Sequence, residues 1–201
     1  LPSVLLIEDN KDMQTFLRSG IAQQYQIYTA SDGASGINLA RDLIPDIIIT
    51  DLMLPILDGH QVCQRLKSDE LTNHIPIVML TAFSDQTSRL EGLRGGADIF
   101  LTKPIDLAEL KIRLKMLINR RKYHEHMQSM LKNGIVSSED DLSAPENHFI
   151  KKVSAILDEN LADENFGLME LCKSIGMSRS QLFRKLKALM NQSPSTFIRL
   201  Y

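Results

Sequence analysis

Short β-branched runs alternate with helix-length amphipathic stretches from Ser3 to about Asn119, and this alternation restricts the fold more than any other feature. The expected strands cover residues 4–7, 26–30, 46–50, 77–80 and 98–101, and the expected helices cover residues 11–20, 33–43, 59–68, 85–95 and 106–119. Since crossovers between parallel strands are right-handed, the pattern predicts an α/β fold with a doubly wound, five-stranded parallel sheet. In such a sheet the ligand site lies at the carboxyl ends of the strands.

The pattern changes after the last expected helix. Residues 134–147 are rich in serine and acidic residues and include a proline, which is typical of a linker. From His148 onward only helical periodicity remains, with helices expected at residues 149–160, 168–175 and 179–189 and from Pro194. We therefore predict a first domain at 1–132, a linker at 133–146 and a small all-helical domain at 147–201.

The helix expected at residues 106–119 has no stop signal at its end. We expect it to continue to about Leu131, before Asn133 and Gly134. Four of its leucines are spaced three, four and three residues apart, namely Leu107, Leu110, Leu114 and Leu117. This spacing is compatible with a seam that pairs two copies in a homodimer and also with packing on the sheet, and we favour packing.

The charge of the chain is nearly balanced, at −2 with a pI of about 6.2, so nucleic-acid binding would require a local basic patch. The apolar runs fall far short of the roughly 18 residues of a membrane span, so we expect no direct membrane contact from this segment. Cys63 and Cys172 are far apart, which fits neither a disulfide framework nor a paired-thiol metal site. This cysteine usage favours buried, reduced thiols and a cytoplasmic location.

Acidic and phosphate-binding side chains are placed at the ends of four expected strands. Glu8 and Asp9 close the first, Asp51 the third and Thr81 the fourth, and Lys103 follows the fifth. Three carboxylates in one crevice repel one another and need cations, and hard oxygen ligands suit Mg²⁺. A carboxylate can also accept a phosphoryl group, with Thr81 and Lys103 supplying a hydrogen bond and a charge at Asp51. Helix capping would explain one acidic residue at a strand end, but it does not explain the whole set.

These residues lie in motifs that resemble the receiver domain of two-component response regulators. The motifs are Leu5-Leu6-Ile7-Glu8-Asp9-Asn10, Thr50-Asp51-Leu52-Met53-Leu54-Pro55 with Asp58-Gly59, Val78-Met79-Leu80-Thr81-Ala82, and Lys103-Pro104. The resemblance covers about residues 2–119 and implies a flavodoxin-like fold with Asp51 as the phosphoacceptor. It also implies that Glu8 and Asp9 are the acidic pair of a Mg²⁺ site, completed by Asp51 and the backbone carbonyl of Met53.

The same resemblance implies further roles. Thr81 and Lys103 would hold the phosphoryl group, and the peptide bond between Lys103 and Pro104 would be cis. Phe100 would be the aromatic switch, with a ring that turns inward when Thr81 moves; ordinary packing is the alternative for this ring. Met53 and Phe83 stand where some receivers carry polar side chains that orient the attacking water, so we expect slow loss of the phosphoryl group.

The end of the chain carries a candidate helix-turn-helix. Ser178 and Gln181 form a capping box, and Gly176 can supply the turn between helices expected at 168–175 and 179–189. From Leu171 onward there is no acidic residue and there are six basic ones, namely Lys173, Arg179, Arg184, Lys185, Lys187 and Arg199. A solvated helix face is the alternative, but a local basic patch is what DNA binding requires.

Residues 147–201 resemble the first half of an AraC-type DNA-binding domain. The matching segments are 166–172, 176–187 and 192–198. In that family the helix that begins at Arg179 would enter the major groove, with Ser180, Phe183 and Arg184 facing base edges and Arg179, Lys185 and Lys187 nearer phosphates. The family has two helix-turn-helix units and this chain reaches only the helix that joins them, so we expect weak, salt-sensitive DNA binding.

Together these features predict a phosphorelay response regulator and not an enzyme. Its partners would be the phosphodonor domain of a histidine kinase and promoter DNA. Receiver followed by AraC-type domain is also the order at the end of membrane-bound hybrid sensor kinases, so we favour a hybrid parent, in which the receiver could instead act only as an intramolecular module. An aspartyl-nucleophile phosphohydrolase would need an acid where Met53 stands, and a flavin-binding protein would need a phosphate cradle where Glu8 and Asp9 stand.

Overall fold

The computed structural model describes the chain outside residues 83–95, 133–143, 161–162, 164–165, 191 and 201. The described chain divides into two compact units, Leu1–Arg120 and Arg121–Tyr201. The helix expected at 85–95, Phe83 and most of the expected linker lie outside the described residues.

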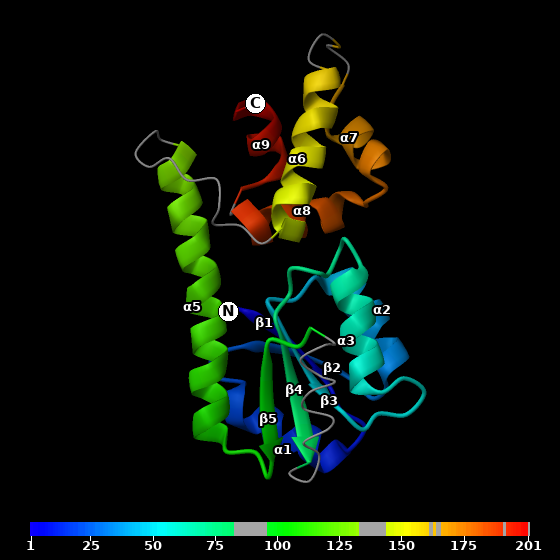
Figure 1. The fold of residues 1–201 in the computed structure, drawn as a ribbon, viewed down its shortest axis with the longest axis vertical. Helices are drawn as coiled ribbons and strands as arrows, with labels where there is room; N and C mark the ends of the chain where they lie inside the picture. Colours follow the sequence, from blue (N-terminus) through cyan, green and yellow to red (C-terminus); the bar gives the residue numbers. More distant parts are fainter. Residues whose placement is uncertain (83–95, 133–143, 161–162, 164–165, 191, 201) are drawn as a thin grey trace. The chain divides into compact units, whose positions relative to one another are not determined.

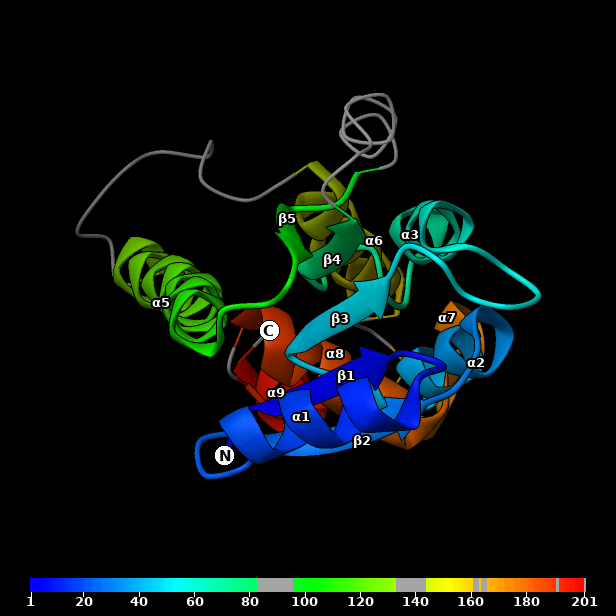
Figure 2. The same cartoon turned by 90° about the horizontal axis from the view of Figure 1, so that it is seen from below.

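The first unit is built on a parallel sheet of five strands in the order β2-β1-β3-β4-β5. The strands are β1 (Ser3–Ile7), β2 (Gln26–Ala30), β3 (Ile47–Asp51), β4 (Ile77–Ala82) and β5 (Ile99–Lys103). Helices α2 (Gly33–Leu43) and α3 (Gly59–Ser68) cover one face, and α1 (Lys11–Ile21) and α5 (Leu107–Lys132) cover the other (Figure 2). The doubly wound five-stranded sheet predicted from the sequence is confirmed.

Successive side chains of the central strands point to opposite faces of the sheet and so fill both layers of the core. In β1, Leu5 and Ile7 join the cluster under α2 and α3, whereas Val4 and Leu6 join the cluster under α1 and α5. All four side chains are fully buried. Strands covered on both faces are apolar throughout for this reason, which is why they were recognisable in the sequence.

Three helices of this unit begin at polar caps. Asn10 accepts a hydrogen bond from the Met13 amide, and Asp32 accepts one from the Ser35 amide. Asp58 and Gln61 form a capping box at the start of α3. Each cap satisfies an amide that the helix itself leaves unpaired, and so fixes where the chain turns after a strand.

Three strands extend one or two residues further than the apolar pattern predicted. Asp51 pairs with Leu80, and Ala82 pairs with Lys103, so Asp51 and Lys103 stand on the strands themselves. Parallel pairing uses backbone groups and continues through polar residues at the carboxyl edge.

Helix α5 continues to Lys132, close to the expected end. Leu110 and Leu114 are fully buried on the sheet, and Leu107 and Leu117 pack against the same cluster. The interpretation of these leucines as sheet packing is confirmed, and a seam that pairs two copies stays a prediction, since Leu107 and Leu117 are only partly buried.

The second unit contains only helices within its described residues (Figure 1). After the last part of α5, from Arg121, these are α6 (Ala144–Glu159), α7 (Leu168–Ile175), α8 (Arg179–Met190) and α9 (Pro194–Leu200). Helix α6 begins earlier than expected because Pro145 is tolerated in a first turn. Gly176 has a φ of 75° and ends α7 in the left-handed conformation, and Ser178 and Gln181 form the predicted capping box, so α7 and α8 are joined as a helix-turn-helix requires.

The core of this unit is formed by one face of each helix. It contains Phe149, Val153 and Leu157 of α6, Leu171 and Ile175 of α7, Leu182, Leu186 and Leu189 of α8, and Phe197 of α9. Leu182, Leu186 and Leu189 therefore share one buried face of α8. Within the described part of the chain, no helix combines the length and the apolar character that crossing a membrane would require.

Candidate functional site: an acidic edge with a lysine

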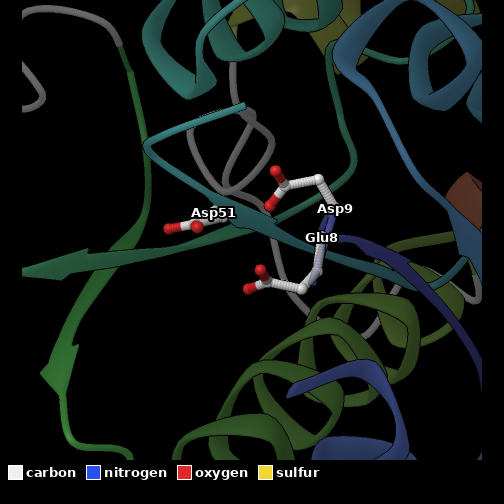
Figure 3. Close-up of side chains that lie close together, drawn as sticks. All are labelled: Glu8, Asp9 and Asp51. Atoms are coloured by element: carbon white, nitrogen blue, oxygen red, sulfur yellow. The ribbon is translucent and has the colours of Figure 1, made fainter. Parts of the chain in front are cut away.

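Three carboxylates gather where β1 and β3 end. Ile7 is in register with Thr50, so the next residues along each strand, Glu8 and Asp51, stand side by side. Asp9 follows on the same loop, and the ligand oxygens of Glu8, Asp9 and Asp51 lie within 4.8 Å of one another. Figure 3 shows the three side chains together at this edge, two from the end of β1 and one from β3.

The three carboxylates differ in their exposure. Glu8 is 1% exposed and Asp51 is 6% exposed, whereas Asp9 is open to solvent. Burial raises the pKa of Glu8, and the neighbouring Asp51 carboxylate raises it further; Lys103 and the Asn10 amide act in the opposite direction. The site therefore concentrates negative charge in a place where water screens it poorly, and this favours a bound cation.

Lys103 supplies one such cation. Its Nζ lies 2.8 Å from Asp51 Oδ2 and 3.2 Å from Glu8 Oε2. Burial lowers the pKa of Lys103, but the hydrogen bond and charge of Asp51, with those of Glu8, more than offset this, so the pKa is raised overall. The Lys103–Pro104 peptide bond is cis, as the receiver resemblance implied.

The donor set fits a hard divalent cation. One lysine cannot neutralise three carboxylates, and the exposed side of the cluster leaves Asp9 open to solvent. Mg²⁺ binds carboxylate and carbonyl oxygens and keeps several of its waters, which a half-open edge permits. Met53 lies two residues after Asp51, in the loop that follows β3, and is 75% exposed.

Thr81 and Phe100 lie on the neighbouring strands. Thr81 is 7% exposed and its hydroxyl donates to the Ala82 carbonyl oxygen at 3.3 Å. Phe100 is half-buried and packs against the cluster under α2 and α3, in register with Met79. The structure thus brings Glu8, Asp51 and Lys103 into direct contact and places Thr81 next to the acceptor strand.

Gly59 has a part in this site that was not predicted. A Cβ built on Gly59 would lie 2.4 Å from the carbonyl oxygen of Asp51, so only glycine lets α3 approach the acceptor backbone. The Gly59 amide donates to the Leu52 carbonyl oxygen at 2.9 Å, and the Leu52 amide donates to the Leu80 carbonyl oxygen. The Asp58-Gly59 pair in the sequence was the available signal.

A second unpredicted feature is a hollow of about 390 Å³ beside the carboxylates. Its lining joins Glu8 and Lys103 to residues at the start of α1, namely Asn10, Asp12, Met13 and Phe16. Phe16 is 43% exposed there. An apolar side chain beside a charged site was not recognisable in the sequence, because Phe16 lies within an ordinary amphipathic helix.

Of the six α8 side chains predicted to contact DNA, five are exposed and one is buried. The exposed residues are Arg179, Ser180, Phe183, Arg184 and Lys187. Lys185 is only 1% exposed, with Nζ 4.7 Å from the centroid of the fully buried Phe149 ring. A role for Lys185 near phosphates is therefore wrong, because Lys185 stands on the inward face of α8 between Leu182 and Leu189.

Three comparisons place this site among known proteins. Residues 4–115 match the family model described as the response regulator receiver domain. Over 196 residues the chain is 33% identical to Histidine kinase P4 of Formosa agariphila, a match that covers 98% of this chain and 14% of that protein. Over 121 residues it is 40% identical to the DNA-binding dual master transcriptional regulator RpaA of Synechocystis sp., which covers 60% of this chain and 50% of the relative.

A solved structure agrees with the fold and the acidic site. It is the receiver domain of sensor histidine kinase PA1611 from Pseudomonas aeruginosa PAO1, with a magnesium ion coordinated in its active-site cleft. The TM-score is 0.56 at 31% identity, and the match covers 59% of this chain and 98% of that one. The chain spans half or less of the length of the two sequence relatives named above. Through residues 4–115 it belongs to the response regulator receiver domain family of two-component systems, whose receiver domains bind Mg²⁺ in the acidic site.

Proposed function

We propose that Asp51 accepts a phosphoryl group from the phosphohistidine of a histidine kinase, and that the acceptor state controls DNA binding by the helical unit. The observation that carries the first part is the position of Asp51. This carboxylate stands at the end of β3 among two further carboxylates and is held by Lys103 at 2.8 Å. A nucleophile and a charge-neutralising group are thus together at one strand edge.

The transfer is a displacement at phosphorus. An Oδ of Asp51 attacks the phosphorus atom as the P–N bond to the donor imidazole breaks, and the imidazole nitrogen keeps the electron pair. Lys103 moves its charge from the carboxylate to the phosphoryl oxygens, which need it as the transfer proceeds. The Thr81 hydroxyl donates to a phosphoryl oxygen instead of to the Ala82 carbonyl that it contacts now.

Glu8, Asp9, Asp51 and the Met53 carbonyl are the groups that would hold Mg²⁺. When bound, the metal supplies positive charge that neutralises the phosphoryl oxygens. Glu8 is 1% exposed, so water screens its carboxylate poorly, and a cation bound beside it would favour the ionised form that burial disfavours. Asp9, which is exposed, would be the ligand that is open to solvent.

Thr81 and Phe100 would report the reaction to the rest of the molecule. When the Thr81 hydroxyl turns to the phosphoryl group, it leaves space that the half-buried Phe100 ring can enter. These movements of Thr81 and Phe100 would change the surface of β5. In the sequence, β5 precedes α5 and the segment that leads to the helical unit.

The helical unit would bind promoter DNA in the major groove. The capped α7–turn–α8 arrangement, the AraC-type resemblance and the exposed α8 residues Arg179, Arg184 and Lys187 support this role. Local positive charge without acidic residues after Leu171 supports it too. With one helix-turn-helix in this chain, affinity would be weak and strongly dependent on salt.

The parent protein would be a hybrid two-component sensor and regulator acting at the cytoplasmic side. Histidine kinase P4, which matches nearly the whole chain, is a kinase by name, and this chain covers a small part of it. The proposed organisation is a receiver at 1–132, a linker at 133–146 and an AraC-type segment at 147–201, with no catalytic role in turnover for this segment.

Incubation with a small-molecule phosphodonor and Mg²⁺, followed by intact mass measurement, tests the acceptor. We expect an adduct of about 80 Da on the wild-type chain and none on Asp51→Asn. The control is Asp69→Asn, which removes a carboxylate that pairs with Arg41 away from the site. An adduct that persists in Asp51→Asn would contradict the assignment.

The side chain of Met53 would make the phosphorylated state long-lived. It is exposed beside the acceptor and cannot act as a base toward water. We expect Met53→Glu to shorten the half-life of the phosphorylated chain, by up to roughly 100-fold if the carboxylate orients water well. A wild-type half-life of seconds in Mg²⁺ buffer would contradict this interpretation.

A further inference from the structure

A concavity of about 550 Å³ opens on the helical unit between α8 and the start of α9. Arg179, Ser180 and Arg184 of α8 stand on one side of it, and Ser193 and Ser195 stand on the other. Its described lining includes two arginines, three serines and no carboxylate. The concavity therefore joins cationic and hydroxyl groups from two separate helices.

The remaining lining is apolar. Leu168, Phe183 and Pro194 complete the surface, and Phe183 is 43% exposed, while Pro194 is buried. Lys187 Nζ lies 5.8 Å from the centroid of the Phe183 ring, which adds positive charge beside it. A ligand that fits this lining has an anionic part for the arginines and an apolar, ring-shaped part for Phe183.

The hydroxyl groups are not equivalent. Ser193 is already engaged, since its Oγ accepts from the Thr196 amide at 3.1 Å and lies 2.7 Å from Thr196 Oγ1. Ser195 and Ser180 are both exposed, one on each side of the concavity. Ser195 is therefore the α9 group that can meet a ligand held by Arg179 and Arg184.

We propose that this concavity binds one sugar-phosphate unit of the DNA backbone, with Ser195 and Arg179 at the phosphate. Phe183 would lie against the deoxyribose instead of the base edge that the AraC-type resemblance implied. The inference rests on the proposed DNA-binding function and adds α9 to it. Phosphate contacts fix the register of a protein on DNA without reading sequence. Ser195 would thus set how deeply α8 lies in the groove, while Arg184 reaches a base edge.

The test compares two serine-to-aspartate variants in the same unit. Ser195→Asp puts a negative charge into the concavity, whereas Ser174→Asp puts the same charge on an exposed site of α7 that is not part of its lining. Binding to short duplexes is measured by fluorescence anisotropy at low salt. We expect Ser195→Asp to weaken binding at least about tenfold on every sequence, and Ser174→Asp to weaken it less than about twofold.

Salt dependence and a phosphate scan locate the contact. Ser195→Asp should reduce the slope of log K against log salt by about 1, as loss of one phosphate contact does. A single methylphosphonate in the duplex should weaken the wild type at one position and leave Ser195→Asp unaffected there. Circular dichroism of both variants establishes that they fold.

Each outcome decides one question. If wild type binds DNA, Arg184→Ala weakens it and the two aspartate variants behave alike, the concavity is not a DNA site and only this inference fails. If inorganic phosphate shifts the Ser195 amide resonance while Ser195→Asp keeps full DNA affinity, the concavity holds a small anion and the inference is also overturned. If wild type binds no duplex at low salt, the proposed DNA-binding function fails, and this inference with it.

Discussion

Each unit contains a lysine with close contacts to other side chains, but the partners and the exposure of the two lysines differ. In the receiver unit, Lys103 has a side chain that is 26% exposed, and two carboxylates accept its hydrogen bonds. In the helical unit, Lys185 is 1% exposed and lies over the ring of Phe149. The Lys103 side chain is therefore partly open to solvent, whereas Lys185 is enclosed in a core.

The difference separates a lysine used in chemistry from one used in packing. Carboxylate partners can be exchanged for phosphoryl oxygens, so Lys103 can change partners during the proposed transfer without leaving the site. An aromatic ring inside a core offers no such exchange. Lys185 is instead a fixed link between α8 and α6, which gives the helix a defined position in its unit.

The largest expected effect tests Lys103 as a reactive partner. Lys103→Met should lower the rate of Asp51 phosphorylation by a small-molecule donor by roughly 10²–10³-fold, because a positioned charge is lost where the transferred group needs it. Stopped-flow or timed mass measurements report the rate. Lys67→Met, which removes a lysine paired with Asp98 elsewhere in the unit, is the matched control and should stay near wild type.

The next effect tests Lys185 as a packing residue. Lys185→Ala should lower the free energy of unfolding of the helical unit by about 2–3 kcal/mol, since the stem and its ring contact are removed from a filled core. Lys185→Met keeps most of the volume and should cost less than about 1.5 kcal/mol. Urea denaturation followed by circular dichroism measures both; equal losses would mean that the charge matters more than the stem.

A smaller expected effect concerns the pH dependence of folding stability, which Lys103 reduces through its contact with Glu8. Burial and Asp51 raise the pKa of Glu8 above its unfolded value of 4.5, so the ionised form of Glu8 opposes folding once the pH exceeds that value. Without Lys103 the pKa would rise further. In metal-free buffer, Lys103→Met should therefore lose more stability than wild type between pH 4.5 and pH 7, and Mg²⁺ should restore part of it.

The smallest effect compares the two thiols. Burial raises the pKa of Cys63 to about 11, and also raises the pKa of Cys172, which is 7% exposed where Cys63 is 0% exposed. Because the thiolate is the reactive form, both should resist alkylation in the native chain at pH 8, and labelling should speed up as the pH rises. Peptide mass mapping should find Cys172 modified first; earlier modification of Cys63 would mean that the receiver unit opens more readily.

The sheet was predictable because its strands are buried on both faces. The run from Val4 to Ile7 is apolar at every position, and each residue has a core to enter. The predicted ends of β3 and β5 were less accurate. Asp51 and Lys103 pair through their backbones, and no apolar residue in the sequence indicates that pairing. The acidic site itself could be assembled from the strand ends, since parallel strands finish at one edge.

Lys185 is a residue whose burial could not be predicted from its charge. It lies three residues after Leu182 and four before Leu189, which is the spacing of the buried α8 face. That periodicity indicates burial, whereas the AraC-type resemblance and the basic run favoured a phosphate contact. Helical spacing was the better guide, because a lysine stem can pack as an apolar chain when its ammonium finds a ring.

Gly59 gives the acceptor a direction in which it can respond. Since α3 touches the Asp51 carbonyl so closely that no Cβ fits between them, the acceptor strand has no space to retreat on that side. We expect extra volume added at the Asp51 carboxylate to be accommodated on the side of β4 and β5, where Thr81 and Phe100 stand. The missing side chain at residue 59 thus lets α3 block one side of the acceptor strand, and we expect structural changes on phosphorylation to occur on the other side.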